Sequence, residues 1–332
     1  MPSPKQLTTW QLIHKSGQQN LPVMLLYVLE SNGSSPGRQG FLMAVNATGE
    51  MEGSIGGGIM EHKFVEMAKE KLNHGPAFRH GPELTIRTQY HDKSAAHNQS
   101  GMICSGDQTI LLYRVQPTDL LAVQAIITCL EQNRNGILEL SPSGIHFFAD
   151  HLPETNYRFT MESEENWLYQ ERLGYKNQLF IIGGGHCALA LSRIIGQMDF
   201  YIRLFDDRPD LHTVELNDSA HEKIVVSSYS ELTNQLPSGD HHYVVVMTFG
   251  YRTDDLAIRA LLGKELTYLG VLGSKTKIDK LFSEYRAEGI EEEKLNRIHA
   301  PVGLPINSQT PEEIAISIAG EIIRVKNGVN QY

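Results

Sequence analysis

Hydrophobic and polar residues follow each other in a pattern that predicts two regions of different architecture. In the first region, residues 23–29 are a continuous apolar run typical of a buried strand, and residues 41–45 and 51–55 flank a turn that contains Asn46 and Gly49. Apolar residues at helical spacing predict a helix over 59–72. The other elements expected here are a weakly amphipathic helix over 4–18, strands over 83–90 and 107–115, a helix over 118–132 and two short strands near 137–149.

The pattern changes in the middle of the chain. Residues 151–176 are rich in charge and have no sustained period, so we expect a linker there. From residue 178 onward, strand-like and helix-like segments alternate, which predicts a mostly parallel sheet. We therefore expect an N-terminal domain over 1–150 and a C-terminal domain over 177–332.

A glycine-rich turn opens the second region. In QLFIIGGGHCALALSRIIGQM, Gly183, Gly185 and Ala188 fit the G-x-G-x-x-A form of the dinucleotide-binding fingerprint, with Gly184 and His186 inside the same turn. Asp206 follows about 20 residues later at the end of the next strand, where an acid can accept from a ribose hydroxyl.

Strand, turn, helix, strand and acid come in the required order. The fold class is therefore predicted to be α/β, with a C-terminal Rossmann-like parallel sheet domain and a smaller N-terminal α+β domain. The ligand of the turn stays open among NAD, another nucleotide and a phosphate group, and a turn that serves packing alone is the alternative.

Further strands are expected over 222–227, 242–248 and 267–272, and the last leads into GSKTK. Ser274 can cap the helix that begins there, and Lys275 adds positive charge, so this is a second candidate anion site. An ordinary solvated helix start is the alternative. Thr310, Pro311 and Glu313 predict the start of a final helix.

Two glycine-rich segments of the N-terminal region offer backbone donors. They are GSSPGRQG over 33–40, where Ser34, Ser35 and Arg38 add side-chain donors, and GSIGGG over 53–58, whose Gly56, Gly57 and Gly58 run into a helix. Each could hold an anion, and each could equally be a structural turn that needs glycine.

The chain has three cysteines, and so small and odd a number does not indicate a disulfide framework. Cys104 lies in the glycine-flanked segment GMICSGD and could act as a nucleophile, a sulfur carrier or a soft-metal ligand, with inert packing as the alternative. A helix dipole would lower the pKa of Cys187, although we favour packing there, and Cys129 is expected in a helix core.

Charge and composition narrow the functional classes. With 29 basic and 39 acidic residues the net charge is −10, which argues against a large nucleic-acid footprint but leaves a local basic patch open, and we expect no nucleic-acid partner. No apolar run approaches the about 20 residues of a membrane span, and no secretory pattern opens the chain, so we expect no membrane partner and a cytoplasmic location. No metal-binding motif and no G-x-S-x-G hydrolase motif appears, and we expect no metal site.

Together these motifs resemble the XdhC/CoxI family of accessory factors for xanthine and carbon monoxide dehydrogenases. The resemblance runs from about Val23 to about Lys326 and is carried by four groups of segments. They are ESNGSSPGRQGFLMAV, GEMEGSIGGGIME, GMICSGD, and a C-terminal set with GGGHCALALSRI, LFDDRPD, YLGVLGSKTK and APVGLPINSQTPEEIAISIAGEII. The chain departs from the family pattern at Ser105, Phe249 and Pro305.

The resemblance implies a maturation chaperone rather than an enzyme. It would bind molybdenum cofactor, protect it during sulfuration and deliver it to an apo-molybdenum hydroxylase of the xanthine dehydrogenase type. On this resemblance, the cysteine of the family's C-G-G segment maps to Cys104, and its glycine loops map to 33–40 and 56–58. A cysteine desulfurase is a further expected partner, and a homodimer is expected.

Two other functions remain open from the residues. One is an NAD(P)-dependent oxidoreductase, and the other is a non-catalytic nucleotide-binding scaffold. Because no general base accompanies the turn, we expect NAD(P) binding to be weak and without dehydrogenase turnover. We also expect Cys104 to be accessible and to face Gly183–Gly185 across the domain junction.

Overall fold

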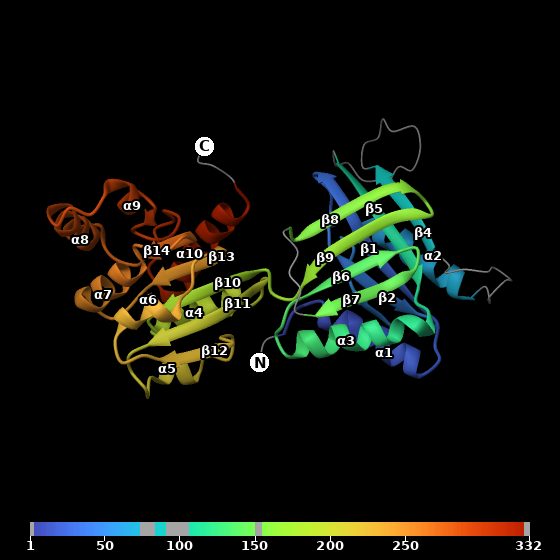
Figure 1. The fold of residues 1–332 in the computed structure, drawn as a ribbon, viewed down its shortest axis with the longest axis horizontal. Coiled ribbons are helices and arrows are strands. Elements are labelled where there is room, and N and C mark those ends of the chain that lie inside the picture. Colours follow the sequence, from blue (N-terminus) through green and yellow to red (C-terminus); the bar gives the residue numbers. More distant parts are fainter. Residues whose placement is uncertain (1–2, 74–83, 91–105, 150–154, 329–332) are drawn as a thin grey trace. The chain divides into compact units, whose positions relative to one another are not determined.

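The computed structural model describes residues 3–73, 84–90, 106–149 and 155–328. Within them the chain divides into two compact units, and the boundary along the sequence falls between Gly174 and Tyr175. The N-terminal unit is α+β and the C-terminal unit carries a parallel sheet, so the predicted fold class is confirmed. Figure 1 shows the two units in the colours of the sequence.

The N-terminal unit contains a five-stranded antiparallel sheet in the order β3-β2-β1-β5-β4 and a four-stranded antiparallel sheet in the order β7-β6-β9-β8. Its helices are α1 (Leu7–Gln18), α2 (Gly58–Asn73), η1 (Pro117–Asp119) and α3 (Leu120–Glu131). Its strands are β1 (Val23–Gly33), β2 (Leu42–Asn46), β3 (Met51–Gly53), β4 (Leu84–Tyr90), β5 (Gly106–Arg114), β6 (Gly136–Ser141), β7 (Gly144–Ala149), β8 (Tyr157–Ser163) and β9 (Asn166–Leu173).

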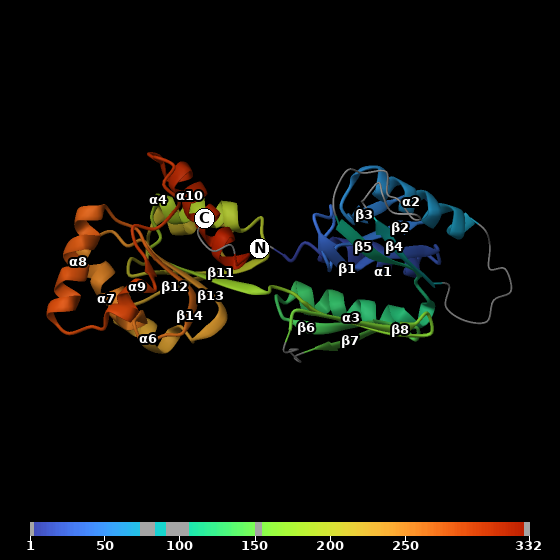
Figure 2. The same cartoon turned by 90° about the horizontal axis from the view of Figure 1, so that it is seen from above.

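Both faces of β1 are buried, which explains its unbroken apolar run. One face, with Leu25 and Tyr27, packs on α1, α3 and the four-stranded sheet. The other face, with Met24 and Leu26, packs on α2. Figure 2 shows the resulting layers, with α2 above the five-stranded sheet and α3 between that sheet and β6 and β7.

The prediction of a linker over 151–176 is wrong for most of the residues that the structure describes there. Residues 157–173 form β8 and β9, and β9 pairs with β6 in the N-terminal unit. Alternate residues of β9 are buried, including Trp167, Tyr169 and Glu171. The period of two typical of a strand is therefore present, but it is hard to recognise in the sequence because one of the buried residues is charged. With these strands included, the N-terminal unit is no smaller than the C-terminal one.

The C-terminal unit is a six-stranded parallel sheet in the order β12-β11-β10-β13-β14-β15. Its strands are β10 (Asn177–Ile182), β11 (Phe200–Asp206), β12 (Glu222–Val225), β13 (Gly239–Val246), β14 (Leu266–Val271) and β15 (Ile298–His299). Its helices are α4 (His186–Ile195), α5 (His212–Glu215), η2 (Tyr229–Glu231), α6 (Leu232–Gln235), α7 (Tyr251–Leu261), α8 (Lys275–Ala287), α9 (Glu292–Asn296) and α10 (Pro311–Lys326).

This strand order reverses direction between β10 and β13, as in a doubly wound Rossmann fold. Alternate residues of β10 pack on opposite sides, Leu179 and Ile181 toward α4 and α10, and Phe180 and Ile182 toward α7 and α8. In such a sheet, ligands bind beyond the carboxyl ends of the strands beside the reversal. The glycine turn after β10 lies at that position.

Candidate functional site

The glycine turn after β10 is tightly packed at its first residue and open at its third. Gly183 has φ +104°, and a Cβ there would lie 2.5 Å from the carbonyl oxygen of Met247. Gly183 therefore has to be glycine for conformation and for space. By contrast, Gly185 has φ −69°, and a Cβ on it would meet no atom within 4 Å. His186 begins α4 and is exposed.

Asp206 ends β11 where the sequence predicts an acid. Its carboxylate accepts from Gly184 N at 2.6 Å, from Arg208 N at 2.9 Å, and from Nε and Nη2 of Arg208 at 2.8 Å each. Burial would raise the pKa of Asp206, but the hydrogen bonds from Arg208 and Gly184 outweigh it and lower this pKa below its usual value. Protein donors thus fill about four acceptor positions, the capacity of a carboxylate. The ribose contact expected for Asp206 stays a prediction, and it requires Arg208 to move.

Arg208 also contacts an exposed aromatic ring. Its guanidinium carbon lies 5.1 Å from the ring centroid of Phe249, which follows β13 and is 66% exposed. Sequence reasoning included neither residue in the site. The signal was available, because both follow the carboxyl ends of strands beside the sheet reversal.

A buried ion pair lies on the other side of the turn. Asp254 of α7 is fully buried and accepts from the Thr248 hydroxyl at 2.6 Å, from the Thr248 N–H at 3.1 Å and from the Lys277 ammonium. The backbone of Thr248 also lies against Gly183. The group joins the loops after β10 and β13 to the start of α8. The sequence did not single out Asp254, which lies in the first turn of α7 outside any recognised motif.

Ser274 caps α8, since its hydroxyl oxygen accepts from Lys277 N at 3.3 Å. Lys275 is exposed and makes no ion pair with the residues that the structure describes. The expected helix start is therefore confirmed, and anion binding at Ser274 and Lys275 stays a prediction.

In the N-terminal unit, the two glycine-rich segments lie against each other. A Cβ on Gly37 would be 2.0 Å from the carbonyl oxygen of Ile55, and one on Gly56 would be 2.4 Å from Gly37 N. The Gln108 side chain bridges the segments, donating to the carbonyls of Gly37 at 2.9 Å and Ile55 at 3.4 Å. The sequence predicted glycine turns here but gave no sign that they touch.

The helix start after Gly56–Gly58 already holds an anion of the chain. All three glycines have positive φ, at 125°, 76° and 70°. The Glu61 carboxylate accepts from the Ser54 hydroxyl at 2.6 Å, Ile55 N at 2.9 Å and Gly57 N at 3.0 Å. The nest of donors predicted for an anion therefore exists, and Glu61 fills it. Ligand binding by Gly56–Gly58 stays a prediction that requires Glu61 to give way.

The candidate side chains of the segment 33–40 differ in their exposure to solvent. Ser35 is buried and its hydroxyl donates to the Gly37 carbonyl at 3.1 Å, so it stabilises the turn. Ser34 and Arg38 are exposed, and Arg38 Nη1 donates to the Gly33 carbonyl at 2.9 Å. Gly33 in turn pairs with Gly106 of β5.

Cys104 lies outside the described residues, two positions before Gly106. Its accessibility and the expected approach to Gly183–Gly185 stay predictions. Cys129 is buried in α3, as expected. Burial, with a contribution from Glu312, raises the pKa of the Cys187 thiol, so the expectation that a helix dipole lowers that pKa is wrong.

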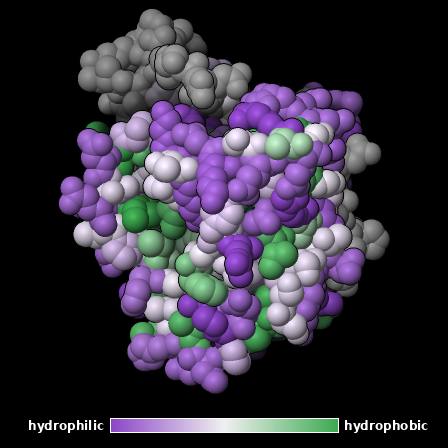
Figure 3. Space-filling model, turned by 90° about the vertical axis from the view of Figure 1, so that its left-hand side faces the viewer, coloured by the Kyte–Doolittle hydropathy of each residue, from purple (hydrophilic) through white to green (hydrophobic). Residues whose placement is uncertain are grey.

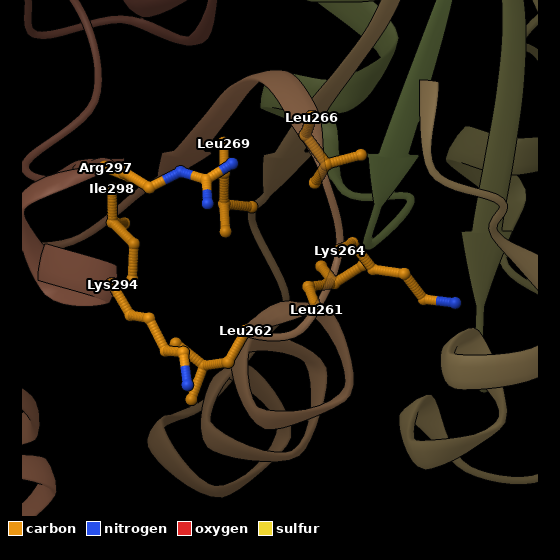
Figure 4. A pocket seen from close by; sticks show the side chains of 8 residues that line it. All are labelled: Leu261, Leu262, Lys264, Leu266, Leu269, Lys294, Arg297 and Ile298. Carbon is orange, nitrogen blue, oxygen red and sulfur yellow. The ribbon is translucent and has the colours of Figure 1, made fainter. Parts of the chain in front are cut away.

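Other candidate features lie away from the glycine turns. A pocket is lined by leucines, Ile298, Lys264, Lys294 and Arg297 at the amino ends of β14 and β15, opposite the carboxyl edge, and Figure 4 shows Lys264 pointing away from the hollow. Within the described ranges no three side chains of His, Cys, Asp or Glu are grouped as metal ligands. Over the same ranges, every helix is too short or too polar to cross a bilayer.

Comparisons with known proteins match both units. Residues 179–322 match the model of the XdhC Rossmann domain, and residues 17–80 match the model of the XdhC and CoxI family. The protein YqeB of Escherichia coli is 24% identical over 320 residues, covering 94% of this chain and 45% of that protein. A probable xanthine dehydrogenase subunit of Bacillus subtilis is 27% identical over 162 residues, covering 49% of this chain and 47% of the relative.

The chain thus spans about half the length of these curated relatives. Among solved structures, the crystal structure of a xanthine dehydrogenase from Bacillus halodurans aligns with a TM-score of 0.69 and 22% identity over 97% of both chains, a likeness of fold. Matches to the family models on both units place this protein in the XdhC and CoxI family.

Proposed function

We propose that this protein is an accessory factor in the maturation of a molybdoenzyme of the xanthine dehydrogenase type. In this role it binds molybdenum cofactor as cargo, protects it during sulfuration and delivers it to the apoenzyme. The observation that carries the proposal is the match of both units to the XdhC and CoxI family.

The contacts of the N-terminal unit support a cargo surface where β1 ends and β5 begins. Gly33 pairs with Gly106, and the exposed Ser34 and Arg38 lie on the same segment as Gly33. Arg38 uses Nη1 on the Gly33 carbonyl, and its other donors suit the phosphate of a pterin cofactor. Cys104 precedes Gly106 by two residues, and a thiolate is a soft partner for molybdenum and sulfur.

The partner in this proposal is an apo-molybdenum hydroxylase. Because the cofactor must be handed over without exposure to solvent, we expect a contact of modest area with an apolar centre and a polar rim. The face in Figure 3 is mostly hydrophilic, with small separate apolar patches, so that face gives little support for a large permanent interface. Binding of a cysteine desulfurase and formation of a homodimer stay predictions.

The test is the ligand that the protein carries. The full chain is purified from cells that make molybdenum cofactor and is denatured, and the fluorescence of released pterin is measured. We expect pterin from the wild type and little from Cys104→Ala, with an unchanged melting temperature. Cys187→Ala, which removes a thiol from the C-terminal unit, is the matched control and should retain pterin.

A second measurement addresses delivery. Deleting the gene should leave a xanthine dehydrogenase-type enzyme of the host poorly loaded or poorly sulfurated, and Cys104→Ala should not restore it. The proposal fails if every molybdoenzyme of the deletion strain remains fully loaded and sulfurated.

A further inference from the structure

The half-buried Arg208 and the exposed Phe249 form a pair at the carboxyl edge of the C-terminal sheet, and the proposed cargo site does not use them. The guanidinium carbon lies 5.1 Å from the ring centroid, within the distance of a cation–π contact. Phe249 is 66% exposed, so its ring adds little to the core. Such a pair presents flat surfaces of the kind that stack on a planar base.

The carboxylate of Asp206 fixes the orientation of the guanidinium. Nε and Nη2 of Arg208 each donate to Asp206 at 2.8 Å, which uses one edge of the planar group. Nη1 makes no hydrogen bond with the described part of the chain. The second edge of the guanidinium, formed by Nη1 and Nη2, is therefore held in a fixed orientation and still has N–H donors available. Two oxygens of a phosphate group fit that edge.

The pair adjoins the glycine turn through direct contacts. Asp206 binds Arg208 and also accepts from Gly184 N at 2.6 Å. Phe249 directly follows Thr248, whose Cα would lie 2.8 Å from a Cβ on Gly183. Beside them, the position of Gly185 is open to approach. All of these residues end or follow β10, β11 or β13, next to the strand reversal.

We propose that the C-terminal unit binds a nucleotide whose ribose carries a phosphomonoester, of the NADP type, in preference to one with a free ribose diol. The base stacks beside Phe249 and the guanidinium, and the ribose phosphate takes the outer edge of Arg208. A free diol lacks its usual acceptor, because Arg208 and Gly184 occupy the oxygens of Asp206. This inference does not depend on the proposed cargo function.

The experiment is calorimetric titration of the full-length protein with NADP⁺ and, separately, with NAD⁺. We expect NADP⁺ to bind at least about tenfold more tightly, as hydrogen bonds between charged groups predict. The preference should shrink as salt is raised, since the added contact joins two charges that solvent can reach. Equal affinities, or no binding of either nucleotide, would overturn the proposal.

Two variants separate recognition from folding. Arg208→Lys keeps a positive charge beside the buried Asp206 but removes the fork, so the preference should fall below about threefold with the fold intact. Phe249→Ala should weaken both nucleotides and leave their ratio unchanged. Arg193→Lys, on the exposed side of α4, is the control and should match the wild type. A full preference in Arg208→Lys would contradict the assignment.

Discussion

Asp206 Oδ2 accepts a hydrogen bond from the backbone N–H of Gly184 at 2.6 Å, which ties the end of β11 to the turn after β10. The acid of the fingerprint is thus present at the expected place, but its carboxylate accepts hydrogen bonds from the protein itself. It orders the turn and, through Arg208, the surface beside it. A ligand that binds here meets a guanidinium rather than a bare carboxylate.

The first and third glycines of the turn should respond differently to alanine. Gly183→Ala forces a Cβ into backbone atoms at φ +104° and should destabilise the unit by roughly 1–3 kcal/mol or more. Gly185→Ala meets open space and should leave the melting temperature nearly unchanged, while a methyl group there hinders a bound phosphate. Thermal unfolding of both variants checks the first effect, and nucleotide titration of Gly185→Ala checks the second. Similar melting temperatures for the two variants would contradict the packing described here.

Glu61 should stabilise the start of α2 as an internal anion. Glu61→Ala leaves the N–H groups of Ile55 and Gly57 without their acceptor, and we expect a loss of about 1 kcal/mol in the free energy of unfolding. Added sulfate should recover part of this loss, because the emptied nest can then hold a free anion. Glu70→Ala, at an exposed position of the same helix, serves as the control in urea unfolding with and without sulfate. If both variants unfold like the wild type, the role of Glu61 is disproved.

The buried Glu171 carboxylate of β9 depends on tyrosine hydroxyls. It accepts from Tyr27 at 2.6 Å and from Tyr169 at 2.7 Å. Tyr27→Phe removes one hydrogen-bond donor from a buried carboxyl group and should lower the free energy of unfolding by roughly 1–3 kcal/mol. Tyr90→Phe, where the ring is exposed, should change it little. Chemical denaturation of the two variants makes the comparison, and equal stabilities would refute the dependence.

His221 should make stability depend on pH. Burial lowers the pKa of His221 to about 4, and its Nδ1 accepts from Ile202 N at 2.9 Å. The neutral ring is therefore the folded form, and the unfolded chain binds a proton near pH 6.5. Between these values the unfolded state holds more protons, so stability falls as pH drops from about 6.5 to about 4.

We expect this loss to be on the order of 1 kcal/mol, because the ring is only partly shielded from solvent. In His221→Gln, the dependence on pH should be weaker over the same interval. His212→Gln is the control, since His212 is exposed. Urea unfolding at pH 7 and pH 5 gives the measurement, and an unchanged pH dependence in His221→Gln would exclude this histidine as its source.

Much of the fold could be predicted because the informative segments are locally consistent. The run over 23–29 and the hairpin around Asn46 and Gly49 became β1, β2 and β3, and Thr310 caps α10 with Glu313 as its sequence indicates. The order of strand, turn, helix and acid sufficed for the C-terminal fold. By contrast, β9 was not predicted, because Glu171 occupies a core position. The burial of this carboxylate depends on the hydroxyl of Tyr27, which is far away in the sequence.

The sequence predicted which residue types form the candidate site, but it did not predict which of those residues contact one another. Glycine-rich composition indicated the turns, whereas the meeting of Gly37 with Gly56 depends on long-range strand pairing that no local pattern encodes. Likewise, the sequence offered Asp206 as a ligand group but could not show that Arg208 occupies it. Contacts of this kind arise only when the sheet brings separate loops together.

The crossing of Gly37 and Gly56 limits how this protein can be redesigned. Because backbone meets backbone there, no compensating change of side chain can make room for a larger residue at either position. A library that tests the proposed cargo binding should therefore leave both glycines fixed and vary Ser34 and Arg38, which are exposed. Natural divergence should follow the same rule, with these two glycines inherited together and variation confined to their exposed neighbours.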